Sequence, residues 1–207
     1  MLALSVEILP VTPEIAEGAA KALAQAFLLE PVTDVFFPPS EGRKLEKLRA
    51  LFGWAIRYRL LAGLPAYVAF KEGRVVGACT LRVPNQVLAP ETEALWDEAA
   101  PIIGKQADAR LEEYDAIQKK NLPERPHHYL VAIGVLPELH GRGIGGKLLQ
   151  AAIELAEADS FSNGIALDNA SEANAGFYGR FGFEEYAREP FGSAAIRFLF
   201  RPNRAQP

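Results

Sequence analysis

The chain has 207 residues, of which 49% are hydrophobic and 23% charged, and its formal net charge is -4 with a pI near 5.5. This balance predicts a packed core and argues against a disordered chain. The acidic charge, without a basic run, argues against a nucleic-acid partner, and no apolar run is long enough to span a bilayer. The single cysteine, Cys79, excludes an internal disulfide, and its apolar surroundings favour a buried structural thiol over a nucleophile. We therefore expect a reducing compartment, most simply the cytoplasm.

The first part of the chain predicts a strand, two helices and a hairpin. SVEILPV reads as the strand, and residues 12–31 as a helix that Thr12 can cap. Three prolines then indicate a loop, and residues 43–61 have the periodicity of a second helix. PAYVAF and VVGACTLRV, joined by KEGR, predict a β-hairpin in which Gly73 can take a positive φ.

Residues 84–126 are mainly polar and have helical periodicity. Pro101 and Gly104 are expected to break this segment. A small sheet domain does not need such a piece, and a solvated helix face explains most of its charge. We predict a helical insertion at about 84–126 within a single domain of residues 1–207.

The last part of the chain predicts a parallel crossover followed by two strands. HYLVAIGVL is continuously apolar, which is typical of a strand buried on both faces. GGKLLQAAIELAEA then reads as a helix and GIALDN as the next strand, so the three should form a right-handed parallel unit. SEANAGFYGRFGF reads as a short helix that ends near Gly182, and EEYAR and AAIRFLF as strands. The fold class is therefore α/β, with a mixed sheet.

A glycine-rich loop, Gly141-x-Gly143-x-x-Gly146, joins the buried strand to its helix. Glycines let a backbone approach phosphate, and a helix N-terminus adds free N–H groups, so the loop predicts an anion site. Tight packing of helix against strand is the alternative. The spacing also matches a dinucleotide-binding loop, with Asp168 as the ribose contact. LPELH, however, separates strand from glycine, and Asp168 lies far along, so an NAD(P)-dependent oxidoreductase is the less favoured hypothesis.

Two segments carry a family resemblance. VAIGVLPELHGRGIGGKLL resembles the acetyl-CoA-binding motif of the GNAT superfamily of N-acyltransferases, and ALDNASEANAGFYGRFGFEEY resembles its closing strand, helix and FY…GF segment. The style is closest to puromycin N-acetyltransferase-like small-molecule acetyltransferases. Strong similarity covers residues 126–186, and the first half matches only in the order of its elements. The resemblance implies a GNAT-like fold: a central mixed seven-stranded sheet, flanked by helices, with a splayed parallel pair in the middle.

The implied reaction transfers acetyl from acetyl-CoA, a cosubstrate, directly to a primary amine of a small molecule. By resemblance Tyr178 is the catalytic proton donor to the leaving thiolate, although it could instead be a core aromatic. Asn174 is implied to contact the pantetheine arm, with Ser171 as the alternative because many members carry the asparagine earlier. The implied cofactor-binding residues combine strand amides, the glycine loop and this asparagine: Ile133, Gly134, Val135, Gly141, Arg142, Gly143, Ile144, Gly145, Gly146 and Asn174.

The general base is not identified by the resemblance. Several relatives carry a Glu or His six residues before Val135, but this chain has Tyr129, a weak base. His127 or His128 could serve, because histidine titrates near neutral pH, but a histidine pair at the start of a strand is more often solvated. His140 stands where relatives often carry Gln or Arg, and we interpret it as a hydrogen-bonding residue of the loop.

The sequence also does not identify the residues of the acceptor pocket. Glu30, Asp34, Phe36 and Phe37 would suit a cationic amine with an apolar body, while a helix end followed by a hydrophobic loop explains them equally well. Three histidines and one cysteine offer no metal-binding pattern, and direct transfer needs no acetylated Cys79. Family habit suggests a homodimer. Because the base position is unfilled, a non-catalytic acyl-CoA-binding sensor stays the main alternative function.

Overall fold

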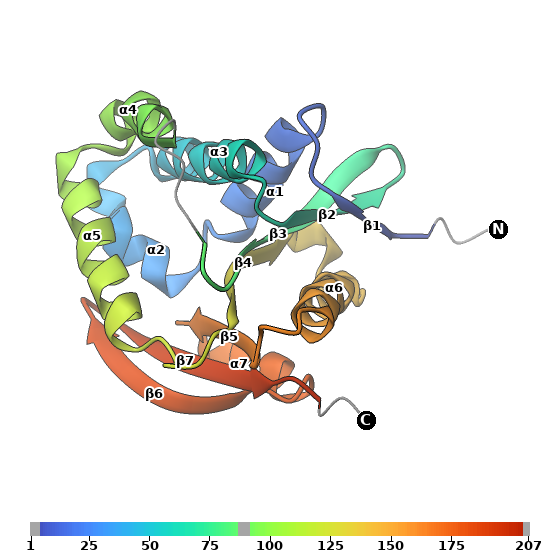
Figure 1. Ribbon diagram of the computed structural model, residues 1–207. Coiled ribbons are helices and arrows are strands. Elements are labelled where there is room, and N and C mark those ends of the chain that lie inside the picture. Colours follow the sequence, from blue (N-terminus) through green and yellow to red (C-terminus); the bar gives the residue numbers. More distant parts are fainter. Residues whose placement is uncertain (1–4, 87–91, 205–207) are drawn as a thin grey trace.

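The computed structural model describes residues 5–86 and 92–204 (Figure 1). Its strands are β1 (Glu7–Pro10), β2 (Ala66–Lys71), β3 (Arg74–Arg82), β4 (His128–Val135), β5 (Gly164–Asn169), β6 (Glu184–Phe191) and β7 (Ala194–Pro202). Its α-helices are α1 (Ala16–Ala26), α2 (Pro31–Phe36), α3 (Lys44–Ala62), α4 (Thr92–Ile103), α5 (Lys105–Lys120), α6 (Ile144–Ala158) and α7 (Glu172–Gly179). Two short 3-10 turns are η1 (Pro39–Glu41) and η2 (Pro137–Leu139).

The strands form one seven-stranded sheet in the order β1-β2-β3-β4-β5-β7-β6. β4 and β5 are parallel, and the other neighbouring pairs are antiparallel. The crossover between the parallel strands is α6, as the apolar strand–helix–strand pattern predicts. The predicted mixed sheet, with its parallel pair in the middle, is confirmed, and its pattern differs from that of a doubly wound parallel sheet.

Helices cover both faces of the sheet (Figure 1). α1 packs on β3 and β4 with α3 outside it, and α6 packs on β2 to β5 from the other face. The apolar core is correspondingly divided into two clusters. One joins α1, α2 and α3 to one side of the sheet, and the other joins α6 to the opposite side through residues such as Leu148, Leu130 and Leu167. This two-layer burial explains why β4 is apolar throughout.

Two helices, α4 and α5, lie between β3 and β4 in the chain, where the sequence predicts a helical insertion. The predicted break at Gly104 is correct, because this glycine has φ 87° and stands between the two helices. The expected break at Pro101 is wrong, since α4 continues through it to Ile103. α5 packs against α2, which in turn contacts β7, so the inserted segment borders the same side of the sheet as α2 (Figure 1).

Two local expectations for the N-terminal part are also wrong. Thr12 does not cap α1: the chain first makes a turn, with Ile15 N–H donating to Thr12 O at 3.2 Å, and the helix starts at Ala16. The loop expected from the prolines contains α2. Its Thr33 hydroxyl donates to Glu30 O at 2.7 Å and to Phe27 O at 2.8 Å, which fastens α2 to the end of α1.

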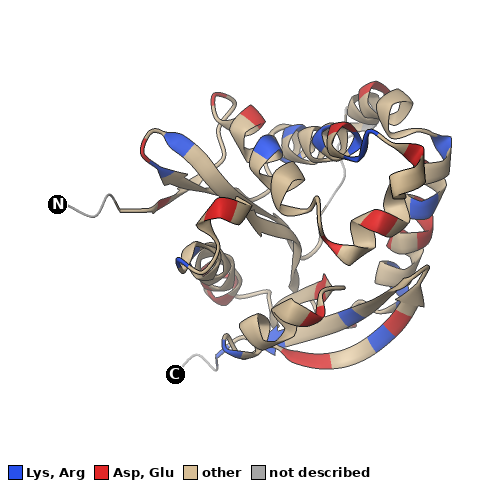
Figure 2. Cartoon of the chain, turned by 180° about the vertical axis from the view of Figure 1, so that it is seen from behind, with Lys and Arg blue, Asp and Glu red and all other residues tan. Residues whose placement is uncertain are grey.

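Charged residues of both signs are spread over the helices and along β6 (Figure 2). Many are paired, for example Arg110 with Glu41 at 2.8 Å and Arg188 with Glu185 at 2.8 Å. Within residues 5–86 and 92–204, no helix has the length and apolar character needed to cross a membrane.

Candidate active site

The parallel strands β4 and β5 are paired only at their beginnings. The register runs from His128 opposite Ile165 to Leu130 opposite Leu167 and extends no further. On its other edge β4 remains paired with β3 as far as Val135, after a bulge between Leu130 and Ala132. The two strands therefore form a fork, and the open edge of β4 carries backbone groups that a strand partner would otherwise use.

A pocket of about 480 Å³ lies at this fork. Its walls come from the fork itself, the loop before α6, the end of α1 and the face of α7: Ala26, Phe27, Glu30, Ile133, Gly134, Val135, Leu139, His140, Gly141, Gly143, Ile144, Gly145, Gly146, Asn174, Phe177, Tyr178 and Arg180. The resemblance assigns eleven residues to catalysis or cofactor binding, namely Tyr178 and the ten implied cofactor-binding residues. All of them except Arg142 line this pocket.

The glycine loop presents an uncapped helix N-terminus to the pocket. Gly141 and Gly143 have φ values of 74° and 77°, a region that favours glycine, and open space surrounds the Cβ position of each. Gly143 is the N-cap of α6 and provides no side-chain hydrogen bond, so the first N–H groups of the helix lack intrahelical acceptors. Such a turn fits the diphosphate of a coenzyme, because it combines close backbone approach with a partial positive charge.

His140 links this loop to the strand, as interpreted from the sequence. Its Nε2 donates to Val135 O at 2.9 Å. Leu136 N–H donates in the other direction, to Val76 O on β3, at 2.9 Å. Since backbone groups alternate along a strand, Val135 directs its own N–H and C=O toward the open side of the fork.

The opposite wall is made by α7, which begins directly after β5. Asn169 fixes this start, because its side chain donates to Ser171 O at 2.7 Å and accepts from Ser171 N–H at 3.1 Å. Ser171 is the N-cap of α7 and does not line the pocket, whereas Asn174 does. Tyr178 also lines it, with only 7% of its surface exposed and its ring edge-on to Phe177 at 5.1 Å.

The Tyr178 hydroxyl is held in its protonated form. Burial raises the pKa of this phenol well above its usual range, and the negative charges of Glu30 and Asp168 add to the rise. Tyr178 is therefore a neutral hydrogen-bond donor across the physiological pH range, and both carboxylates lie close enough to influence it.

Glu30 brings a carboxylate into the pocket from the N-terminus of α2. Burial raises its pKa, while a hydrogen bond from Asn174 Nδ2, at 3.4 Å, opposes the rise. In the described residues no Lys or Arg nitrogen lies within 4.0 Å of it. Asp34 does not share this place: it is exposed and pairs with Lys44 at 2.6 Å. Phe36 and Phe37 are buried in the core. Of the four residues considered for an acceptor pocket, only Glu30 therefore lines the pocket.

The basic side chain at the pocket is Arg180, which the sequence did not single out. Its guanidinium lies 5.9 Å from the centre of the Phe177 ring. Arg142 is exposed and close enough to Glu72 to lower the pKa of that carboxyl, and Lys147 Nζ donates to Val6 O at 3.3 Å. Its place two residues after the FY pair was the signal from which Arg180 could have been predicted.

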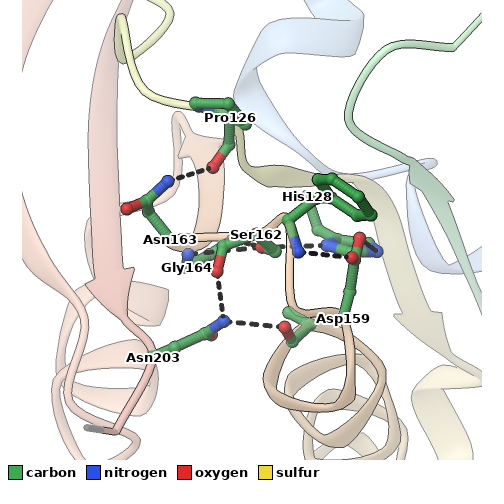
Figure 3. A network of polar contacts seen from close by, with 9 residues as sticks. Pro126, His128, Asp159, Ser162, Asn163, Gly164 and Asn203 are labelled. Carbon is green, nitrogen blue, oxygen red and sulfur yellow. Dashed lines mark hydrogen bonds and ion pairs between the residues drawn. The ribbon is translucent and has the colours of Figure 1, made fainter.

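The histidine pair lies at the paired end of the fork, and neither residue lines the pocket. His128 Nδ1 is 3.1 Å from Ser162 Oγ, and its Nε2 is 3.7 Å from Asp159 (Figure 3). Asn203 donates from its side chain to Ser162 O at 2.9 Å in the same network. These contacts join the start of β4 to the start of β5 and to the chain after β7, which indicates a structural role for His128.

The fork, the uncapped helix and the pocket define an acyltransferase of the kind that the two sequence motifs resemble. The profile of the acetyltransferase (GNAT) family matches residues 29–183, which is most of the chain. The protein therefore belongs to the acetyltransferase (GNAT) family, as the motifs indicated.

Solved structures with the same fold extend over nearly the whole chain. A Corynebacterium glutamicum structure, described as histone acetyltransferase HPA2 and related acetyltransferase, is 24% identical, covers 99% of both chains and has a TM-score of 0.68. The polyamine N-acetyltransferase of Drosophila melanogaster, described as forming N-acetylagmatine, is 20% identical over 95% of this chain and 100% of that one (TM-score 0.59). A mosquito structure described as arylalkylamine N-acetyltransferase like 5b is 14% identical over 96% of this chain and 100% of that one (TM-score 0.61). At these identities the likeness shows the fold.

Proposed function

We propose that this protein transfers the acetyl group of acetyl-CoA directly to a primary amine of a small molecule. The observation that carries the proposal is the fork beyond Leu130 and Leu167. Its open edge lines the same pocket as an uncapped helix N-terminus, a tyrosine hydroxyl and the carboxylate of Glu30. Those are the groups that the anionic phosphates and the thioester of acetyl-CoA, together with a cationic amine, require.

Acetyl-CoA would supply the activated acetyl group, and this chain would hold it. The amides of residues 141–146 bind the pyrophosphate, with Arg180 adding positive charge nearby. Within residues 133–135, the backbone N–H groups on the open edge, such as that of Val135, donate to the thioester oxygen as negative charge develops there. Asn174 contacts the pantetheine arm, because it lines the pocket one helical turn before Tyr178.

Tyr178 donates a proton to the sulfur as the carbon–sulfur bond breaks. Its raised pKa keeps the hydroxyl protonated in the resting protein, and its place on the pocket wall puts it within the region that the pantetheine arm would occupy.

Glu30 receives the cationic end of the acceptor. Its carboxylate is partly buried and has no basic side chain within 4.0 Å in the described residues, so an ammonium group is its natural partner. Phe27 provides an apolar surface beside it. The small amines named for the Drosophila and mosquito proteins support this class of acceptor. We further propose that residues 1–207 form one acetyltransferase domain whose inserted helices, at 84–126, border the acceptor side.

The test has a binding step and a turnover step. Calorimetry and thermal stability should show acetyl-CoA binding, with a smaller effect of NAD(H) at the same concentration. CoA release should then follow the addition of a small primary amine from a panel that also contains a peptide N-terminus. Protection by NAD(H) but not by acetyl-CoA would contradict the proposal. Tight acetyl-CoA binding without CoA release for any amine would instead identify a sensor.

A further inference from the structure

A second carboxylate, Asp168, lies at the point where the two parallel strands separate. Leu130 and Leu167 are the last paired residues, and Asp168 is the next residue of β5. Tyr129 Oη, from the strand opposite, donates to Asp168 Oδ1 at 2.5 Å. Tyr129, which occupies the position where several relatives carry a Glu or His, thus fixes this carboxylate at the base of the fork.

The inserted helix α5 provides the other partners of Asp168. Gln118 Nε2 donates to Oδ1 at 2.7 Å, and the Tyr114 hydroxyl donates to Oδ2. Tyr114 also packs edge-on against Phe36 of α2, with ring centres 5.0 Å apart. Since α2 begins directly after Glu30 and ends at Phe36, Tyr114 links Asp168 to the far end of the short helix that Glu30 precedes, which is about 9 Å long at 1.5 Å per residue.

All three hydrogen-bond donors to Asp168 are neutral. Among residues 5–86 and 92–204 no Lys or Arg nitrogen lies within 4.0 Å of its carboxylate. Arg82 acts at one remove: it donates to Gln118 Oε1 at 2.7 Å and lies 4.9 Å from the centre of the Tyr129 ring. By contrast, the partly buried carboxylate of Glu157 has a direct basic partner in Arg201 at 2.7 Å. Hydrogen bonds from neutral groups thus hold the Asp168 carboxylate in place, while its negative charge has no direct basic partner among the described residues.

The environment of Asp168 suits a group that exchanges a proton. Burial raises the pKa of its carboxyl, and the hydrogen bonds from Tyr114, Tyr129 and Gln118 oppose the rise, with the charge of Arg82. Within residues 5–86 and 92–204, the phenols of Tyr178 and Tyr186 also lie near enough to interact with Asp168. Both of these stay neutral, because burial raises the pKa of each.

Asp168 is not among the residues that line the pocket, so we propose that it takes up the proton that the acceptor amine releases through a bridging water, and that Tyr129, Tyr114 and Gln118 are positioning residues for it. This inference rests on the proposed function. The neutral amine bonds to the acetyl carbon, and its nitrogen loses one proton, which converts the Asp168 carboxylate to the acid. The carbon–sulfur bond breaks, and the thiolate takes a proton from Tyr178. After CoA leaves, exchange with solvent returns a proton to the Tyr178 phenolate and removes one from Asp168. In this division of roles Glu30 binds the acceptor, and Asp168 accepts its proton.

The test compares the pH dependence of kcat/KM in the wild type, Asp168→Asn, Tyr114→Phe and Glu30→Gln, with the amine that turns over best. A general base contributes about 10²- to 10⁴-fold, so Asp168→Asn should lose that factor and the acidic limb of the profile. Tyr114→Phe removes a donor to the charged carboxylate, so the pKa of Asp168 should rise and the acidic limb should move to higher pH. Glu30→Gln, the matched amide substitution, should raise KM for the amine and retain the acidic limb.

A second readout needs no turnover. Infrared difference spectra between the wild type and Asp168→Asn follow the titration of this carboxyl group, and Tyr114→Phe should shift it upward. If the acidic limb of the pH profile of kcat/KM is unchanged in Asp168→Asn, the inference is overturned. The same holds if that limb is lost in Glu30→Gln instead. Neither result contradicts the transferase proposal. If Asp168→Asn does not fold, the limb of Tyr114→Phe decides: a shift supports the inference, and an unchanged limb overturns it. A wild type without CoA release for any amine overturns the proposed function and this inference with it.

Discussion

Gly134 of β4 and Ala26 of α1 approach each other so closely that only a glycine fits in the strand. A Cβ added at Gly134 would lie 2.5 Å from the Cβ of Ala26. Both residues also line the candidate active site, so this contact sets how near the first helix lies to the open edge of the fork.

The close approach predicts that Gly134→Ala destabilises the fold by about 1–3 kcal/mol, the usual range for overpacking. Ala26→Gly removes the opposing methyl group, so the double variant should recover most of that loss. Urea unfolding of the wild type, both single variants and the double variant measures the coupling. If Gly134→Ala lowers the free energy of unfolding equally in the wild type and in Ala26→Gly, the contact with Ala26 is not the cause of the loss.

The glycine loop allows a controlled test of coenzyme binding. Gly143 and Gly73 have nearly the same backbone conformation, with φ 77° and 76°, and neither Cβ position meets another atom within 4 Å. An alanine at either position should therefore cost about 1–2 kcal/mol of stability. Only Gly143 borders the pocket, so Gly143→Ala should also weaken acetyl-CoA binding about tenfold, or about 1.4 kcal/mol, while Gly73→Ala does not. Calorimetry distinguishes these outcomes, and equal affinities would remove the loop from the binding site.

The role of Tyr178 can be separated from its packing. Tyr178→Phe keeps the ring that contacts Phe177 and removes only the hydroxyl. If the hydroxyl protonates the leaving thiolate, kcat should fall about 10²-fold, with the KM for acetyl-CoA and the thermal midpoint nearly unchanged. Tyr186→Phe is the control: its hydroxyl donates to Asn121 O at 2.6 Å on the surface, and its loss should leave kcat unaffected. A Tyr178→Phe enzyme that turns over normally would assign this residue to the core.

The sequence predicted most of the sheet because its apolar patterns match the burial that the fold requires. The continuous apolar run of β4 reflects contacts on both faces, and the Gly73 hairpin reflects a positive φ that few other residues adopt. The short helix α2 was missed for an equally physical reason. It has only six residues, the first of them Pro31, which are too few to show a period, and its position depends on Thr33 contacts with the end of α1.

The site was harder to predict because it is made partly of backbone and partly of contacts between distant segments. The fork depends on where strand pairing stops, which no side-chain pattern records. Asp168 was considered only as a ribose contact, since nothing in one sequence indicates that Tyr129, or Tyr114 from the inserted helix, bonds to it. Glu30 and Asp34 are close in sequence, but Glu30 lines the pocket whereas Asp34 is exposed and pairs with Lys44, so proximity along the chain wrongly grouped them.

The His128 network makes stability depend on pH. His128 is 2% exposed, and burial lowers the pKa of its imidazole, although the charge of Asp159 opposes this. As pH falls below about 6.5, the unfolded chain takes up a proton that the folded chain resists, so His128 favours folding above that pH and this contribution is lost on acidification. The slope from one such proton is at most about 1.4 kcal/mol per pH unit. Denaturant unfolding of the wild type and His128→Gln between pH 5 and 8 isolates the effect, because other titrating groups cancel in the difference. The wild type should lose stability relative to the variant as the pH falls, and parallel curves would show that His128 is protonated equally in both states.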